Sequence, residues 1–415
     1  MADVAELSQA ATSSENAMSS IPFVMFLGGL YLCAAWMLAK TPKTVGALLV
    51  RQWPLVLLML YVAASIAWSY HPEKVISNTV HSFGALFVAM AAAIHYRHQP
   101  HMFARHLSLV LGINMAIHLA ATMVLPSYTI DWQDRMHGLT THPNTLGAMA
   151  FTTVWVNVVV LICDKASKFY LRLFFVVLGV VAMVGADSVT SMMTTMATVL
   201  SIYLINRLQK IGVGRKFYFT VFGLLTIVTL VIITIGSTFD FSGLFSLFGR
   251  DANLTGRTDV WADAFKAIAE HPLLGWSFDD HAYLIAQGMP YTSYHNGILD
   301  VAVSGGLLSL ALIGALFLTW GLDFTKASRV SGLIAPLSAS FFIGYQIHNL
   351  TEASLIAPRG QMWEIFLVLL LLGTCRRPPQ IKTQDSEKSA FSSTLKFSKM
   401  PNAINPVASV IPLKK

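Results

Sequence analysis

The chain has 415 residues, of which 55% are hydrophobic and only 12% charged, and its mean hydropathy is +0.60. A water-soluble protein carries about 25% charged residues, so these values exclude a soluble fold of two or three domains and indicate that most of the surface faces lipid. The net charge of +7 would suit nucleic acid, but the basic residues lie in short loops between apolar runs and in the C-terminal tail, mostly on one side of the predicted membrane, which excludes nucleic acid as a partner.

Residues 1–20 are polar and weakly acidic, without the basic start and apolar core of a typical signal peptide. After them the sequence predicts an all-α, polytopic integral membrane protein with 11–12 transmembrane helices and one large external loop containing short helices. A twelfth helix could lie near residues 45–50. The eleven predicted membrane spans are 21–38, 54–69, 76–95, 107–125, 145–163, 169–186, 188–205, 217–236, 297–318, 333–348 and 363–375.

The apolar runs divide the chain into five parts. They are a disordered N-terminal tail (1–20), an N-terminal transmembrane bundle (21–236), a large external loop with the candidate catalytic residues (237–296), C-terminal transmembrane helices (297–375) and a disordered cytoplasmic tail (376–415).

The basic residues predict the orientation of the helices. Of the 28 lysines and arginines, 22 fall on one side of the predicted membrane and 6 on the other. Cytoplasmic loops carry the excess of Lys and Arg, so the side with 22 is predicted to be cytoplasmic. The polar loop 248–296 is then external.

That segment contains a predicted amphipathic helix, Thr258–Glu270, with apolar residues at three- and four-residue spacing. Arg257 directly precedes the helix, and Arg250 lies one short turn of chain further back. Free N–H groups at a helix start and forked guanidinium groups both suit a diphosphate. The alternative is that the arginines form ion pairs with aspartates of the same loop.

His295 ends the external segment, and Asn296 stands directly before the next apolar run. A histidine at the membrane boundary can accept a proton from a hydroxyl near neutral pH; the alternative is an interfacial histidine bonded to a carbonyl. Asp300 lies one turn inside the span, where a charge is costly. It could orient His295 or serve as a structural partner for another span.

Two shorter external loops add further polar residues. The first, 126–144, carries Arg135 and His142. The second, 348–361, carries Glu352, which we interpret as an ion-pair partner of Arg359 with catalysis as the alternative. The chain has no GxxxxGK[ST], GxGxxG, Asp-x-Asp or HExxH motif, no CxxC spacing among its three cysteines, and no cofactor or metal site is predicted.

Five short segments share glycines, prolines and polar residues at the membrane boundary. They are HGLTTHPNTLG (Gly138, Pro143, Asn144, Gly147), GRTDVW (Arg257, Trp261), HPLLGW (Pro272, Gly275), YHNGILDVAVSGG (His295, Asn296, Gly306) and LTEASL (Glu352). In order, spacing and sidedness these segments resemble the O-antigen ligase and polymerase superfamily of bacterial envelope enzymes. The resemblance extends from about residue 130 to residue 365, and ligase is favoured over polymerase.

The chain departs from the family pattern at two places. A pattern of His, Asn, nine residues, Gly, two residues and then Gly, Thr or Tyr matches from His295 to Gly306 but ends on Ser309. The family arginine that follows a serine in a short external turn is replaced by Val189. Arg135 is interpreted as its substitute. Arg250 and Leu254 form the one useful Arg-x-x-x-Leu motif.

The resemblance implies a membrane glycosyltransferase of the ligase type in the bacterial inner membrane, with a periplasmic active site. Its donor would be a glycan on undecaprenyl diphosphate and its acceptor a sugar hydroxyl of the lipid A core, without metal or ATP. The roles implied are general base for His295, with Asn296 beside it, and diphosphate binding for Arg250, Arg257 and Arg135. An O-antigen or exopolysaccharide polymerase would use the same donor. A transporter or flippase would instead place charges deep in several spans.

Overall fold

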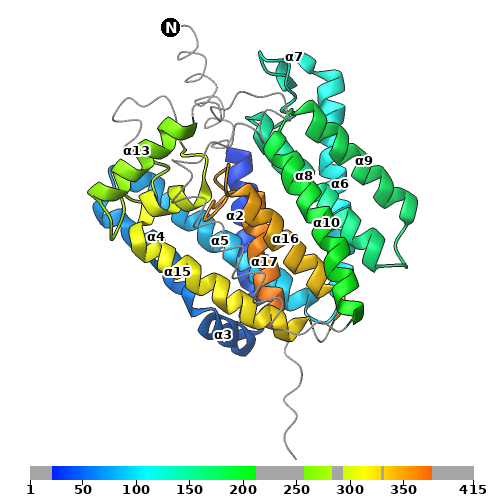
Figure 1. Cartoon of the computed structure of the whole chain (residues 1–415). Coiled ribbons are helices and arrows are strands. Elements are labelled where there is room, and N and C mark those ends of the chain that lie inside the picture. The colour runs from blue at the N-terminus through cyan, green and yellow to red at the C-terminus, as the bar shows by residue number, and fades with distance from the viewer. Residues whose placement is uncertain (1–20, 212–256, 283–292, 329–330, 376–415) are drawn as a thin grey trace, which may run out of the picture. The chain divides into compact units, whose positions relative to one another are not determined.

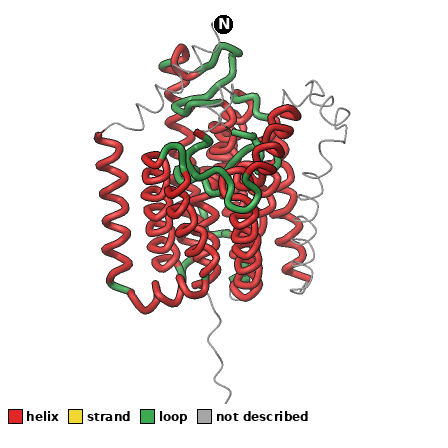
Figure 2. The backbone as a smooth tube through the Cα atoms, turned by 90° about the vertical axis from the view of Figure 1, so that its left-hand side faces the viewer, coloured by secondary structure: helices red, strands yellow, loops and turns green. Residues whose placement is uncertain are grey.

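The computed structural model describes residues 21–211, 257–282, 293–328 and 331–375, which all belong to one compact unit of the chain, Met1–Pro378. The predicted tails 1–20 and 376–415, the predicted span 217–236 and the external segment 237–256 lie outside the described residues. Within the described residues the regular structure is helical (Figure 2). One isolated β-bridge joins Ile130 and Met136.

Helices follow one another along the described chain (Figure 1). They are α2 (Ile21–Ala39), α3 (Pro42–Arg51), α4 (Trp53–Ala64), the 3-10 helix η1 (Ser65–Trp68), α5 (Pro72–Tyr96), α6 (Pro100–Val124), α7 (Pro126–Thr129), α8 (Pro143–Cys163), α9 (Phe169–Gly185), α10 (Val189–Ile211), α13 (Arg257–Glu270), α15 (Gly297–Ala327), α16 (Ile334–His348) and α17 (Gln361–Cys375).

Six of these helices are long and apolar enough to cross a membrane: α2, α5, α6, α8, α10 and α15. A seventh crossing is possible if α3 and α4 count as one span, although they are bent by 85° at Gln52. Every predicted span within the described residues coincides with a helix, which confirms an all-α, multi-pass membrane protein. With 10 residues, α3 extends only about 15 Å, half of the hydrocarbon core, and does not supply the additional crossing considered near residues 45–50.

The helices bury one apolar side in the interior and leave another apolar side exposed. Inside, α8 packs against α6, α9 and α10, while α16 packs against α10, and α17 against α5 and α15. Stacked aromatic rings of Phe341, Tyr345 and Phe366 fill the interior between α16 and α17. On the outside, Leu32 is 73% exposed and Leu200 is 68% exposed. Such exposed apolar faces fit a lipid environment.

A break in α15 shapes the end of the molecule that holds the candidate site. Gly306 has a φ of 57°, which interrupts the helix. The freed backbone groups pair with the turn 272–276: the Leu307 N–H donates to the Pro272 carbonyl (2.9 Å) and the Trp276 N–H donates to the Val303 carbonyl (2.8 Å). The two family segments HPLLGW and SGG thus dock on each other, and they fix α13 and the following turn on α15.

Ser309, the residue at which the family pattern fails, has a defined place in this break. Its hydroxyl donates to the carbonyls of Val301 (2.9 Å) and Gly306 (2.8 Å). The break therefore needs a small side chain with a hydroxyl donor at this position. Buried carbonyl groups that lose their helical hydrogen bond require another donor.

The predicted loop helix Thr258–Glu270 is confirmed as α13, which begins one residue earlier, at Arg257. Its apolar face packs on the first turns of α15, with Trp261 and Ala264 against Tyr294 and Leu299. The indole N–H of Trp261 donates to the Tyr294 carbonyl at 3.0 Å. This bond ties α13 to the residue directly before His295.

Candidate active site

His295 stands just before the first turn of α15, with an unusual left-handed backbone (φ 49°). Its N–H donates to the Ser293 hydroxyl at 3.1 Å, and its ring nitrogen Nδ1 lies 3.6 Å from the Glu352 carboxylate. The ring is 38% exposed, whereas the Glu352 side chain is 13% exposed. Strained backbone gathers at functional sites, and here it turns a half-exposed histidine towards a mostly buried carboxylate.

Glu352 is held from two sides. Its N–H donates to the His348 carbonyl at 2.9 Å, at the end of α16, and its Oε1 accepts the Asn144 amide at 2.7 Å. The Asn144 N–H in turn donates to Nδ1 of His142 at 3.1 Å, so that His142 caps α8. Three segments that are far apart in the sequence, around residues 144, 295 and 352, therefore meet at one place.

Asn296 is buried, and its amide forms structural contacts. Its oxygen accepts the N–H groups of Ile298 (3.0 Å) and Leu299 (3.1 Å), which caps α15, and its Nδ2 donates to the Leu350 carbonyl at 3.1 Å. The Gly297 N–H donates to the carbonyl of Asn349. These bonds fix the start of α15 against the chain just before Glu352. The catalytic role predicted for Asn296 stays a prediction.

Asp300 contacts the turn before His295 and not the ring of His295. It accepts the Tyr294 N–H at 2.8 Å and the Ser293 hydroxyl at 3.2 Å. Its Oδ2 also lies 3.5 Å from Nε2 of His281. Of the two roles considered for Asp300, the contacts favour the structural one, because its carboxylate holds the backbone that presents His295.

His281 is a buried residue that the sequence analysis did not single out. Burial lowers the pKa of His281, but the nearby carboxylates of Asp300, Asp280 and Asp279 outweigh it and raise the pKa above the usual range. Asp280 and His281 both have left-handed backbone conformations, with φ of 57° and 55°. The only signal in the sequence is the triplet Asp279-Asp280-His281 in a loop.

Arg135 belongs to the same end of the molecule. It forms an ion pair with Asp131 at 2.9 Å. Burial raises the pKa of Asp131, yet the N–H groups of Arg135 and Gln133 and the Arg135 guanidinium together lower it. His142 is an exposed residue, but neighbouring protein atoms desolvate its ring and lower its pKa; Glu352 acts in the opposite direction, while Arg135 and His295 add to the decrease. Arg135, His142 and the His295–Glu352 pair are thus within electrostatic reach of one another.

The position of the missing family arginine adjoins this group. Val189 is the first residue of α10, and the hydroxyl of the next residue, Thr190, lies 2.9 Å from the hydroxyl of Thr351. Thr351 directly precedes Glu352. The backbone at position 189 therefore lies near the chain that carries Glu352.

The structure describes only one of the two other predicted anion-binding arginines. Arg257 opens α13, so its backbone N–H lies in the first turn of that helix, where N–H groups have no partner within the helix itself. Arg250 lies outside the described residues. Arg359, predicted as the ion-pair partner of Glu352, is exposed and donates from Nη2 to the Ser77 hydroxyl of α5 at 2.8 Å.

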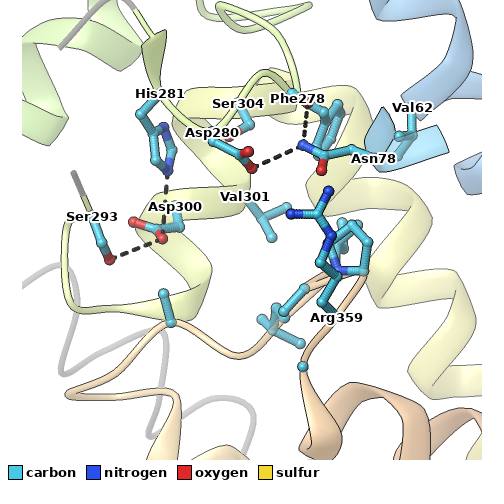
Figure 3. Close-up of a pocket in the computed structure, with 16 residues that line it drawn as sticks. Val62, Asn78, Phe278, Asp280, His281, Ser293, Asp300, Val301, Ser304 and Arg359 are labelled. Carbon is cyan, nitrogen blue, oxygen red and sulfur yellow. Dashed lines mark hydrogen bonds and ion pairs between the residues drawn. The ribbon is translucent and has the colours of Figure 1, made fainter. Parts of the chain in front are cut away.

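Next to the His295–Glu352 pair lies a cavity of about 480 Å³ (Figure 3). Its walls come from α4, α5, the turn after α13, the first turns of α15 and the loop before α17. Ser293 and Ala353, which neighbour the pair along the chain, both line it. The polar and charged residues of the wall are Asn78, Asp280, His281, Ser293, Asp300, Ser304 and Arg359.

Part of the chain is similar to known proteins. Residues 174–314 match the family model described as O-antigen ligase. A curated O-antigen ligase of Pseudomonas aeruginosa is 31% identical over 105 residues, a match that covers 25% of this chain and 25% of that relative. The family segment includes α9, α10, α13, His295 and the break in α15. The match agrees with the resemblance indicated by the motifs: residues 174–314 of this multi-pass membrane protein are similar to the O-antigen ligase family.

Proposed function

We propose that the protein is an O-antigen ligase, a membrane glycosyltransferase that moves a glycan from undecaprenyl diphosphate to a sugar hydroxyl of the lipid A core. The observation that carries the proposal is the contact between His295 and Glu352 (3.6 Å) next to a cavity, with His295 inside the residues that match the ligase family. A half-exposed histidine beside a mostly buried carboxylate suits proton abstraction from a hydroxyl.

The proposed reaction needs one proton transfer and one displacement. With Nδ1 of His295 facing Glu352, Nε2 is the nitrogen available to accept the proton of the acceptor hydroxyl. The acceptor oxygen then bonds to the anomeric carbon of the donor sugar, and the bond between that carbon and the phosphate oxygen breaks. The electron pair leaves with undecaprenyl diphosphate. Because the diphosphate is already a good leaving group, the transfer uses no nucleotide.

Glu352 would act by positioning, as the acidic member of a nucleophile-activating pair does. A carboxylate that accepts the Nδ1 proton fixes the ring orientation and stabilises the imidazolium that forms during transfer. Asn144 holds this carboxylate at 2.7 Å, and Asp300 holds the turn from 293 to 295. The negative diphosphate would be bound by Arg135, Arg250 and Arg257, since guanidinium groups pair with phosphate oxygens in a forked geometry.

Sidedness supports a periplasmic site in the inner membrane. His295, Glu352, Arg135 and the start of α13 all belong to the predicted external loops, and the basic loops, such as the one that contains Lys165, belong to the opposite side. The donor lipid and the lipid A acceptor would then both approach from the plane of the membrane.

A reconstituted assay tests the proposal. The purified full chain in lipid nanodiscs is mixed with undecaprenyl diphosphate carrying an O-antigen glycan and with lipid A bearing its core, in the presence of a chelator and without nucleotide. We expect transfer of the glycan to the core, and we expect His295→Ala to lower the rate by about a hundred- to ten-thousandfold.

The control is Glu270→Gln, an exposed change at the end of α13, which should keep the wild-type rate. Absence of transfer to the lipid would refute the ligase function, and growth of the glycan on the undecaprenyl carrier would identify a polymerase. Full activity of His295→Ala would leave the function in place and refute the proposed base.

A further inference from the structure

The cavity beside the His295–Glu352 pair has a charge pattern that the proposed mechanism does not use. Asp280 uses one carboxylate oxygen to accept the Asn78 amide at 2.8 Å, and among the described residues its second oxygen has no hydrogen-bond partner. Arg359 donates to Ser77, which is its one hydrogen-bond acceptor within the described part of the chain. Both side chains line the same cavity (Figure 3).

These opposite charges are not paired with each other: the described residues contain no ion pair between Asp280 and Arg359. A carboxylate only accepts hydrogen bonds and a guanidinium only donates them. A ligand that satisfies both must offer donors and acceptors on neighbouring atoms. A hydroxyl group does so, because its O–H can donate to Asp280 while its lone pairs accept from Arg359.

The charge of the cavity discriminates between ligand classes. A diphosphate would suit Arg359, but Asp280 and Asp300 would repel it. A cationic ligand would meet Arg359 and also His281, whose pKa the surrounding carboxylates raise. An uncharged ligand with many hydroxyls meets neither obstacle. Apolar wall atoms of Phe278, Val301 and Leu355 then fit the C–H faces of a sugar ring.

The walls are fixed by bonds within the protein. The Asn78 amide joins α5 to the turn after α13 by donating to Asp280 and to the Phe278 carbonyl at 3.1 Å. The Ser69 hydroxyl donates to the buried carboxylate of Asp279 at 2.7 Å. A volume of about 480 Å³ also lies inside the range of roughly 300–1,000 Å³ that is usual for small-molecule sites. The cavity is thus a preformed site.

We infer that this cavity is a subsite for an uncharged sugar ring of one of the two glycan substrates, with Asp280 and Arg359 as the residues that bind its hydroxyls. The inference rests on the proposed function for the source of the sugar. Ser293 and Ala353 connect the cavity wall to His295 and Glu352, so a ring bound here would lie next to the base.

A binding experiment without turnover tests this subsite. Wild type, Asp280→Asn and Arg359→Gln are titrated with three probes: the core oligosaccharide released from lipid A, undecaprenyl diphosphate carrying the glycan, and bare undecaprenyl diphosphate. Each variant removes one charge-assisted hydrogen bond, so we expect about ten- to a hundredfold weaker binding of a sugar-bearing probe. Glu73→Gln, on the same helix as Asn78 but outside the cavity, should bind like wild type, and all melting temperatures should agree.

The probes separate the two sources of the sugar. Weaker binding of the core oligosaccharide assigns the cavity to the acceptor. Weaker binding of the glycan-bearing carrier, with the bare carrier unaffected, assigns it to the donor. Unchanged affinity for both sugar-bearing probes overturns the subsite, as does an equal loss for the bare carrier, which would make it a diphosphate site. Because no reaction is measured, a failure of the transfer assay does not affect this result.

Discussion

His295 stands before α15 and Glu352 in the loop between α16 and α17, and their effects on catalysis should depend on each other. If Glu352 acts only through the ring of His295, Glu352→Gln should lower kcat by at least about tenfold in the wild type and leave the residual rate of His295→Ala unchanged. KM should change little, because the carboxylate does not touch substrate. Steady-state kinetics of the single and double variants check this.

Glu352→Asp serves as the matched variant, since it keeps the charge and should recover part of the rate. Additive losses in the double variant would show that Glu352 has a separate role. A melting temperature that falls in Glu352→Gln would assign the loss to folding through the broken contact with Asn144.

His281 makes a prediction about pH. Its pKa in the folded protein is raised above the ordinary value of about 6.5, so the charged ring stabilises the fold. That stabilisation is fully present below about pH 6.5 and is lost as the pH rises through the raised pKa. The wild-type melting temperature should therefore fall more steeply above pH 6.5 than that of His281→Gln, which does not titrate. Parallel melting curves over this range would contradict it.

For single residues, the sequence predicted several that belong to the site but few of the contacts that these residues form. His295 and Glu352 were recognised from their motifs at the membrane boundary. Glu352 was expected to pair with Arg359, seven residues away, whereas the structure brings its carboxylate to His295 and Asn144. Local spacing favours the near partner, and only the packing of α8 and α16 brings the distant ones together. Asp280, His281 and Asn78 carry no such motif, because their cavity forms only in three dimensions.

The elements follow the apolar runs closely, because a membrane helix must satisfy its backbone internally over a fixed thickness. Each predicted span within the described residues is a helix, and α13 begins one residue from its predicted start. The break in α15 was not predicted, although Gly306 was noted as part of a family pattern. A glycine within an apolar run does not by itself indicate a positive φ. The break at Gly306 becomes visible only with the turn 272–276, which forms hydrogen bonds to it.

The break gives a test with an internal control. In Gly306→Ala the new methyl group would overlap the backbone of Leu273, and alanine is strained at a φ of 57°. We expect a loss of at least about 2 kcal/mol of stability, measured as a lower melting temperature in detergent. Gly314→Ala lies in the same helix with no atom within 4 Å of the added carbon, and should melt at or above the wild-type temperature. Equal melting of the two variants would contradict the structural role of the break.

Across the whole molecule, the two ends of the helices differ in chemistry. One end holds the His295–Glu352 pair and the cavity. The other holds the basic loops and a network in which Gln52, at the bend between α3 and α4, donates to Asp323 of α15 (3.1 Å) and to Thr374 of α17 (2.8 Å). Arg51 pairs with the same aspartate. This network joins the bend between α3 and α4 to α15 and α17, at the end of the helices away from the candidate site.

The difference between the ends predicts their location in the cell. From the excess of basic residues we expect the loop of Ala166 in the cytoplasm and the loop of Thr141 in the periplasm. Both residues are exposed, so each can carry a single cysteine once the three native cysteines are replaced. In cells with a permeabilised outer membrane, a membrane-impermeant maleimide should label Thr141→Cys at once and Ala166→Cys only after the inner membrane is opened. The cysteine-free protein should remain unlabelled, and both variants should react fully after detergent lysis. Immediate labelling of Ala166→Cys with protection of Thr141→Cys would invert the orientation and remove the His295–Glu352 pair from the side where a periplasmic acceptor could reach it.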